Sequence, residues 1–278
     1  MRKTKAQSHF LRTIVYSAAA ITVLILAFII IYILVKGIPN LSLDMFSLNY
    51  TSENASLMPA LLNTIFMTFL SLIIAVPLGV FSAIYLVEYA KRGNKLVSII
   101  RTATETLSGI PSIVYGLFGY LLFVIYLGWG YSILAGAFTI SIMILPLIMR
   151  TTEEALKDIP DMYREGSFGL GAGKLRTVFR VILPSATQGI LAGVILSVGR
   201  IVGETAALIY TAGTVENFAG DLFSSGRTLS IHMYLLWKEG LAQDKAYATA
   251  VVLLVLVVGL NALSALIAKG ITKGKINE

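Results

Sequence analysis

Hydrophobic residues gather into six long stretches along the chain, and polar segments separate them. Each stretch is close to the roughly 20 apolar residues that an α-helix needs to cross a lipid bilayer. Residues 128–130 alone separate the third stretch from the fourth, which predicts a tight hairpin. We expect spans over about residues 14–35, 62–89, 110–128, 131–149, 185–210 and 248–268. The pattern therefore predicts an all-α integral membrane protein with six transmembrane helices in one domain, residues 1–278.

Composition leads to the same class of protein. Hydrophobic residues make up 56% of the chain and charged residues 13%, whereas soluble domains carry about 25% charged residues. The chain has no cysteine, which excludes disulfides, thiolate metal ligands and thiol nucleophiles. Its net charge of +7 could indicate nucleic-acid binding, but in a membrane protein excess lysine and arginine usually marks the cytoplasmic loops. The first apolar run is longer than a signal-peptide core, so we expect an uncleaved first helix.

The distribution of positive charge predicts how the chain is oriented. Seventeen lysines and arginines lie in the N-terminus, the second-to-third and fourth-to-fifth connections and the C-terminal tail, against four in the segments on the opposite side. Because cytoplasmic loops are enriched in these residues, we expect both termini and residues 151–184 to be cytoplasmic. The pattern thus indicates contact with membrane lipid rather than with nucleic acid.

The polar segment 151–184 holds special residues at a defined spacing. A glutamate precedes two small residues, a glycine follows it after six positions, and a Leu-Pro pair closes the segment. Glycine lets a helix end and turn sharply, and proline is tolerated in the first turn of the next helix. We expect a short polar helix that forms a docking knob at the mouth of the bundle; a solvated amphipathic connector is the alternative. The residues of this motif are Glu165, Gly166, Ser167, Gly171, Leu183 and Pro184.

The fifth predicted span carries two charges. Arg200 lies about 22 Å along the helix from Ser185 at 1.5 Å per residue, at a depth where an unpaired arginine costs about 2.5–3.5 kcal/mol. Glu204 follows four residues later, on the same helix face, with Thr205 beside it. One interpretation is an intrahelical ion pair that neutralises itself. The other is an anion pathway in which Arg200, held in position by Glu204, binds an oxyanion through its planar fork of donors.

Two further features of the spans bear on a pathway. Arg150, at the inner end of the fourth span after Pro146, is a second candidate for it, and its alternative role is an ordinary snorkelling residue at the interface. Small residues four positions apart on the fifth span indicate close packing, because such faces let helices approach one another in lipid. These small residues are Gly189, Gly193, Gly199 and Gly203.

The chain lacks the residue sets of an ATP site or of an enzyme. Residues 169–174 look like a phosphate-binding loop, but Phe168 stands where that loop needs glycine and Leu175 where it needs Ser or Thr. His9 and His232 lie far apart and outside the predicted spans, so neither a zinc site nor a Ser-His-Asp set is expected. We expect a transporter subunit that binds no cofactor itself. If transport is driven by ATP, the ATPase is a separate subunit.

Three segments resemble a known family. Residues 165–184 are similar to the EAA loop of ABC-importer permeases, whose pattern is Glu-Ala-Ala, three residues, Gly, nine residues and Ile-x-Leu-Pro; here Gly166 and Ser167 replace the alanines and Val181 the isoleucine. Residues 199–206 resemble a signature of the phosphate branch of these permeases, and residues 107–116 resemble the entry to its third span. The segment Ala-Ile-Tyr-Leu-Val-Glu-Tyr that ends at position 89, and the compact length, favour the PstA type over its PstC-type sister.

The resemblance implies more than the spacing does. It implies the type I ABC-importer permease fold in a prokaryotic cell membrane, and a sister permease that completes one pore. It also implies two cytoplasmic ATPase subunits, which use ATP and Mg and dock on the glutamate loops, and an extracytoplasmic phosphate-binding protein. Arginines at the positions of Arg150 and Arg200 are implied to act in phosphate passage. A permease for another oxyanion (phosphonate, sulfate or molybdate) and an ATP-independent secondary transporter are the alternatives.

Overall fold

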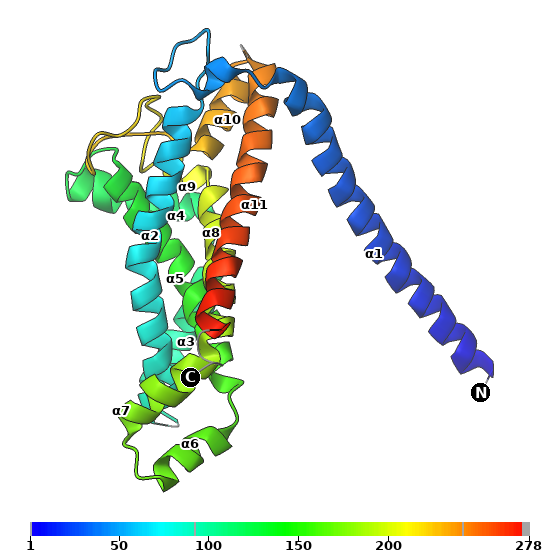
Figure 1. Cartoon of the computed structure of the whole chain (residues 1–278), viewed down its shortest axis with the longest axis vertical. Helices are drawn as coiled ribbons and strands as arrows, with labels where there is room; N and C mark the ends of the chain where they lie inside the picture. The colour runs from blue at the N-terminus through cyan, green and yellow to red at the C-terminus, as the bar shows by residue number, and fades with distance from the viewer. Residues whose placement is uncertain (1, 92, 241, 274–278) are drawn as a thin grey trace.

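The computed structural model describes residues 2–91, 93–240 and 242–273, which form helices and the loops between them (Figure 1). Arg92 and Lys275, two of the charges that predict the orientation, lie outside the described residues. The long helices are α1 (Arg2–Gly37), α2 (Met58–Ile84), α3 (Lys95–Ser108), α5 (Ile133–Lys157), α8 (Leu183–Val202) and α11 (Gln243–Lys273). The shorter α-helices are α4 (Ser112–Gly119), α6 (Asp161–Gly169), α7 (Lys174–Thr177), α9 (Ala206–Ile209) and α10 (Leu229–Glu239). Short 3-10 turns η1 (Ile38–Asn40) and η2 (Leu43–Phe46) follow α1, and π-helical segments η3 (Tyr85–Tyr89), η4 (Tyr120–Tyr126) and η5 (Val178–Ile182) adjoin α2, α4 and α8.

Five helical segments of the described chain are long and apolar enough to cross a membrane, and a sixth is a bent pair of helices. The five straight candidates are Phe10–Asn40, Met58–Tyr89, Ile133–Lys157, Lys174–Val202 and Gln243–Leu266. Most of them are longer than the apolar runs that predict them, because polar turns extend the helices at their ends.

The third span differs from the single span expected over residues 110–128. Helices α3 and α4 form a pair that is bent by 105°, and the break lies at residues 109–111. Pro111 has no amide hydrogen to donate, and it disfavours the helical conformation of the residue before it. Helix α3 therefore ends at Ser108, with Gly109 as its C-cap residue, and α4 projects sideways from the bundle (Figure 1).

The fifth span also ends earlier than expected. Helix α8 stops at Val202, and the turn 203–205 separates it from α9, so residues 185–210 are not one continuous helix. Gly203 is the C-cap residue, and its amide donates to the carbonyl of Gly199. This break changes where the side chain of Glu204 points.

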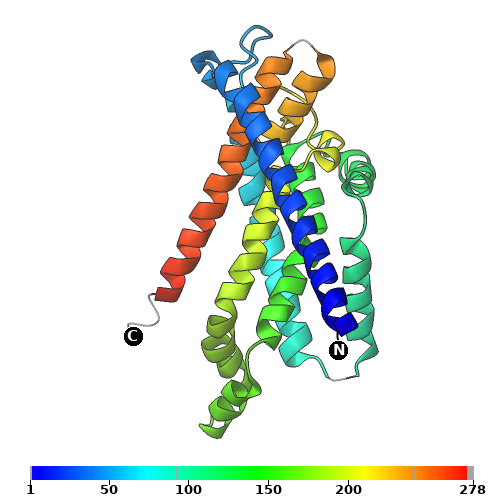
Figure 2. The ribbon, with the colours of Figure 1, turned by 90° about the vertical axis from the view of Figure 1, so that its right-hand side faces the viewer.

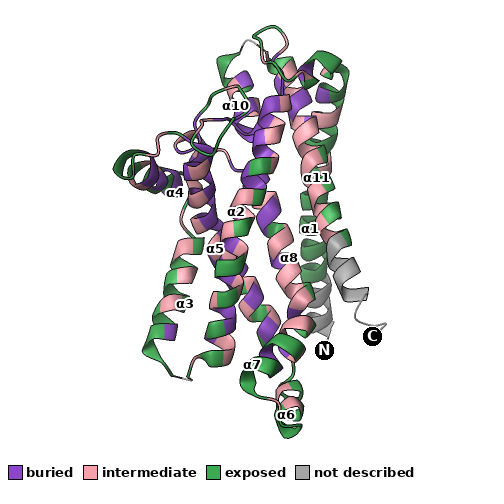
Figure 3. Ribbon diagram, turned by 60° about the vertical axis from the view of Figure 1, so that its left-hand side comes forward, coloured by how far each residue is buried: buried purple, intermediate pink, exposed green. Residues whose placement is uncertain are grey.

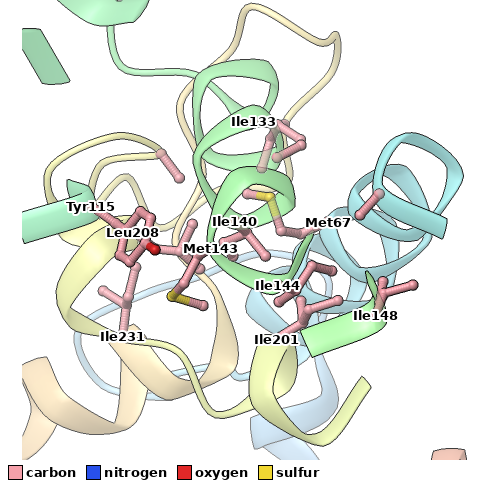
Figure 4. Close-up of a cluster of buried hydrophobic side chains, with 14 residues drawn as sticks. Met67, Tyr115, Ile133, Ile140, Met143, Ile144, Ile148, Ile201, Leu208 and Ile231 are labelled. Atoms are coloured by element: carbon pink, nitrogen blue, oxygen red, sulfur yellow. The ribbon is translucent and has the colours of Figure 1, made fainter. Parts of the chain in front are cut away.

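Helix α5 is the centre of the bundle. Two thirds of its most apolar window is buried (67%), and it packs between α2 and α8. Ile140, Met143, Ile144 and Ile148 of α5 are fully or almost fully buried and form one cluster with residues of α2, α8 and α9 (Figures 3 and 4). The most buried helix therefore carries Arg150 close to its inner end.

Helix α1 leaves the bundle. Its apolar window is 0% buried within the described chain, and it touches α11 near its own C-terminal end (Figures 1 and 2). There the rings of Tyr32 and Tyr247 meet edge to face at 5.9 Å. A Cβ at Gly37 would lie 2.4 Å from the Tyr247 carbonyl oxygen, so this contact requires glycine. The remaining apolar surface of α1 is open to lipid or to another protein.

The two ends of the molecule differ. The start of α1, the end of α11 and helix α6 lie at one end, and α10 and residues 38–57 lie at the other (Figure 1). We call the end that holds α6 the inner end and the opposite one the outer end.

Candidate functional site

Arg150 and Arg200 line the same cavity. It has a volume of about 280 Å³ and lies between α3, α5 and α8, in the inner half of the bundle. Because the two residues are 50 positions apart, the packing of α5 against α8 brings them together. The other charged or hydroxyl side chains that line it are Arg101, Thr104, Glu105, Ser108, Glu153, Glu154 and Lys157.

Arg150 stands at the mouth of this cavity. Its Nε donates to Glu154 Oε1 at 2.9 Å, one helical turn further along α5. The side chains of both residues are exposed (66% and 61%). Water screens an exposed pair of this kind, so the pair adds little to stability. The guanidinium of Arg150 can therefore exchange Glu154 for another anion at little cost.

Arg200 lies in the last turn of α8 and is half-buried. Within the described residues its guanidinium makes no hydrogen bond and no ion pair, so its fork of donors is open to the cavity. The predicted pairing with Glu204 is wrong in this structure. It assumed a helix that continues through Glu204, whereas α8 ends two residues before it.

Glu204 caps the next helix instead. Its Oε1 accepts a hydrogen bond from the amide of Ala207 at 3.0 Å, in the first turn of α9, and the residue is buried. The hydroxyl of Ser230 on α10 donates to the Glu204 carbonyl oxygen at 2.6 Å. Glu204 therefore holds α9 and α10 together and does not line the cavity of Arg200.

Thr205 also lies away from the two arginines. It lines a separate, mainly apolar groove of about 820 Å³ between α1, α4, α9, α10 and α11. Its hydroxyl makes a long hydrogen bond of 3.4 Å to the Gly203 carbonyl oxygen. Of the four residues predicted for the pathway, the structure thus brings Arg150 and Arg200 together and leaves Glu204 and Thr205 outside.

A charge cluster that sequence reasoning missed forms one wall of the cavity. Glu153 Oε1 lies 2.7 Å from the Arg101 guanidinium on α3 and 2.6 Å from Lys157 Nζ on α5. The spacing of Glu153 and Lys157 on one helix was a readable signal. No comparable sequence signal pointed to Arg101, because the segment before Gly109 was expected to be a loop rather than a helix packed on α5.

The predicted docking knob is helix α6 and the turn after it. Glu165 and Gly166 are exposed, and the Ser167 hydroxyl lies 2.8 Å from the Thr177 hydroxyl on α7. Gly171 has φ of +84°, and its amide donates to the Phe168 carbonyl oxygen at 2.9 Å. Such a left-handed residue is a common helix C-terminal signal that glycine adopts without strain.

Exposed apolar side chains cover this knob. These side chains are large and lie at the inner end of the molecule, where burial against a partner would remove them from water. They belong to Met162, Tyr163, Phe168, Leu170 and Leu175. Leu183 and Pro184, which close the motif, form the first turn of α8 and are half-buried.

Gly189 and Gly193 pack α8 onto α5. A Cβ at Gly189 would lie 2.5 Å from Ala155 Cβ, and one at Gly193 would lie 1.9 Å from Thr151 Oγ1. Gly199 and Gly203 do not share this role in the described part of the chain. An added Cβ at Gly199 would meet no atom within 4 Å, and one at Gly203 would meet only the Gly199 carbonyl oxygen, at 3.5 Å. The expected helix contact is therefore limited to the first glycine pair.

The fold is that of ABC-importer permeases. A subunit of a bacterial alginate ABC transporter superposes with a TM-score of 0.71 over 98% of both chains at 16% identity. A subunit of the MetNI methionine ABC transporter in an inward-facing conformation gives 0.60 over 77% of this chain and 93% of that one, at 21% identity.

Sequence relatives define the family. Residues 75–273 match the model of the binding-protein-dependent transport system inner membrane component. The chain is 36% identical over 241 residues to the probable ABC transporter permease protein YqgI of Bacillus subtilis, covering 81% of this chain and 82% of that protein. It is 34% identical to the phosphate transport system permease protein PstA of Pasteurella multocida (83% and 82% covered) and 32% identical to that of Xylella fastidiosa (94% and 96%). The chain belongs to this family of ABC-importer permeases, with PstA-type relatives, and is a multi-pass membrane protein.

Proposed function

We propose that this chain is a permease subunit of an ATP-driven importer of inorganic phosphate. The observation that carries the proposal is the shared cavity of Arg150 and Arg200, with the second guanidinium free of any hydrogen bond or ion pair in the described chain. The names of the PstA relatives, phosphate transport system permeases, support the choice of substrate.

The chemistry of the cavity suits a small oxyanion. A guanidinium presents its donors in a planar fork that matches two oxygens of a phosphate, and such charge-assisted hydrogen bonds are among the stronger ones in proteins. An arginine inside a membrane protein without a fixed carboxylate partner is costly until an anion pairs with it. Arg200 is therefore poised to bind phosphate transiently, and Arg150 can exchange Glu154 for the same anion. Glu204 and Thr205 do not line this cavity, so the proposal gives them no contact with the anion there.

The proposed transporter needs three kinds of protein partner. A second, sister permease would complete the pore, and two cytoplasmic ATPase subunits would dock on the exposed apolar side chains of α6. Those subunits would use ATP and Mg, while this chain binds no cofactor. An extracytoplasmic phosphate-binding protein would deliver the substrate to the outer end. Both termini and α6 would lie in the cytoplasm, as the charge distribution predicts. The bacterial origin of the PstA relatives supports a prokaryotic cell membrane.

ATP would act through the inner end. Closure of the ATPase dimer would displace α6 and tilt α2 and α5, which contain Pro77 and Pro146, and the α3–α4 pair, which bends at Pro111. Proline removes a backbone hydrogen bond and makes a helix easier to bend. The pore would change from inward-open to outward-open, and phosphate would be released to the cytoplasm after hydrolysis.

The test is uptake of labelled phosphate into vesicles that hold this chain, a candidate sister permease and the ATPase. The phosphate-binding protein is added on the side of the membrane that the outer end faces. Arg200→Gln removes the charge in the cavity, and Arg12→Gln makes the same change on α1, outside the bundle. We expect ATP-dependent uptake that Arg200→Gln abolishes without loss of assembly and that Arg12→Gln preserves. Equal uptake by Arg200→Gln and wild type would remove Arg200 from the pathway.

Competing anions decide the substrate. Excess sulfate, molybdate and a phosphonate would each be added during uptake, and we expect unlabelled phosphate alone to compete. Competition by another of these anions, with stronger uptake of it, would keep the transporter class and replace the substrate. Uptake without any ATPase would indicate a secondary transporter instead.

A further inference from the structure

One buried ion pair joins α6 to the second span. The Arg164 guanidinium of α6 donates to Glu88 of η3, from Nη2 to Oε1 at 2.7 Å and from Nε to the same oxygen at 3.1 Å. The two side chains are 16% and 7% exposed. The residues are 76 positions apart, and burial keeps water from screening or replacing the contact.

Arg164 also closes the end of α5. Its Nη1 donates to the Ile159 carbonyl oxygen at 2.8 Å, and its Nη2 to the Leu156 carbonyl oxygen at 2.9 Å. The carbonyls at the C-terminal end of a helix have no partner within the helix, and a positive charge there is favourable. One side chain thus contacts α6, the end of α5 and η3.

The two elements that Arg164 reaches are walls of the arginine cavity. Helix α5 carries Arg150, which is six residues before Leu156, and η3 carries Leu86, which lines that cavity two residues before Glu88. The backbone of α6 packs mainly on α7 and η5, which lead into α8. Without Arg164, α6 would connect to α5 through the short linker 158–160 and would have no charged contact with η3 in the described chain.

We propose that Glu88 and Arg164 form a strut that transmits the displacement of α6 to the inner ends of α2 and α5 and so opens or closes the cavity of Arg150 and Arg200. Both are positioning residues, since neither lines that cavity. The inference rests on the proposed ATP-driven transport. Arginine suits the task because its rigid fork can hold a carboxylate and two carbonyl oxygens at once, which a lysine ammonium does less well.

The main experiment measures coupling in the assembled transporter in proteoliposomes. Glu88→Gln and Arg164→Gln each remove one charge, and Arg164→Lys keeps it. Asp161→Asn is the matched control, because Asp161 is exposed, touches Arg164 at 3.2 Å and lies outside the buried pair. The readouts are phosphate moved per ATP hydrolysed and the stimulation of ATP hydrolysis by phosphate-loaded binding protein.

We expect both glutamine variants to keep ATP hydrolysis while phosphate moved per ATP falls about twofold to thirtyfold, the range that loss of a coupling contact produces. Arg164→Lys should recover part of the loss, and Asp161→Asn should match wild type. Unchanged phosphate per ATP in Glu88→Gln and Arg164→Gln would overturn the strut. Absence of ATP-dependent uptake in wild type would instead refute the proposed function.

A second measurement keeps the ion pair intact, in case the glutamine variants fail to assemble. Spin labels at Asp161→Cys on α6 and Lys91→Cys after η3 are possible because the chain has no native cysteine. The distance between them is measured with and without trapped ATP. We expect it to stay constant because the strut moves as one unit. A change larger than roughly 2 Å, the size of ordinary helix shifts, would show that α6 moves independently of η3 and would overturn the proposal.

Discussion

The close approach of α8 to α5 at Gly193 yields a sharp test of the packing that forms the cavity. In Gly193→Ala the new methyl group would lie 1.9 Å from Thr151 Oγ1 and 2.7 Å from Thr151 Cβ. Rotation of the threonine could move its hydroxyl but not its Cβ, which is fixed to the α5 backbone. The two helices must therefore separate by several tenths of an ångström or more.

The magnitude follows from two opposed effects. Overpacking of this kind costs about 1–3 kcal/mol. Replacing glycine by alanine inside a helix returns about 0.8–1.0 kcal/mol through helix propensity. The net destabilisation of Gly193→Ala is therefore about 0–2 kcal/mol, and a second variant is needed to separate the two effects.

Gly199→Ala supplies the matched control. It makes the same change on the same helix, where the added methyl group would meet no atom within 4 Å. Alanine has a higher helix propensity than glycine, and here it causes no clash. We therefore expect Gly199→Ala to raise the free energy of unfolding by up to about 1 kcal/mol. The difference between the unfolding free energies of the two variants then gives the steric cost at Gly193, about 1–3 kcal/mol.

The assay is thermal unfolding of the isolated chain in detergent, followed by the fluorescence of its two tryptophans. Scaling from soluble proteins of similar size gives roughly 2–4 °C per kcal/mol, so the Tm values should differ by a few degrees or more. Thr151→Ala in the Gly193→Ala background removes the hydroxyl and methyl groups and should restore part of the loss. Equal Tm values for Gly193→Ala and Gly199→Ala would refute the interhelical contact.

Three further predictions concern the coupling loop, the α9 cap and a buried histidine. Gly171→Val should lower phosphate moved per ATP while membrane insertion is unchanged, because a side chain at φ of +84° strains the turn by about 1–3 kcal/mol; normal transport would contradict this. Glu204→Ala should destabilise the isolated chain by about 0.5–2 kcal/mol through loss of the Ala207 cap, and Glu204→Gln, which keeps an acceptor, by less; equal Tm values for the two would refute the cap. Burial, followed by the charge of Arg227, lowers the pKa of His232 to about 3. The unfolded state then takes up the proton first, so stability should be constant above pH 6.5 and fall as the pH drops towards 3, by about 2 kcal/mol at pH 5. His232→Phe should flatten the dependence of Tm on pH over that range, and an unchanged slope would contradict the assignment.

The membrane class of this protein and five of its spans could be predicted from the sequence. The thickness of a bilayer sets the length of apolar run that can cross it, and this length is visible in the sequence itself. The knob at α6 was also readable, since Glu165, Gly171 and Pro184 act on the backbone within a few residues. The ends of the helices were harder to predict from the sequence. Pro111 and Gly203 were visible, but the sequence did not say that one would turn a helix by 105° and the other would end α8.

The site depended on tertiary structure. Arg150 and Arg200 were suspected singly from their positions in the spans, but their common cavity exists because Gly189 and Gly193 let α8 approach α5. The pairing of Arg200 with Glu204 was wrong, because helical periodicity holds only while the helix continues. The contacts of Arg101 with Glu153 and of Arg164 with Glu88 join residues 52 and 76 positions apart. No local pattern determines such contacts, because the free energy that selects them comes from packing whole helices together.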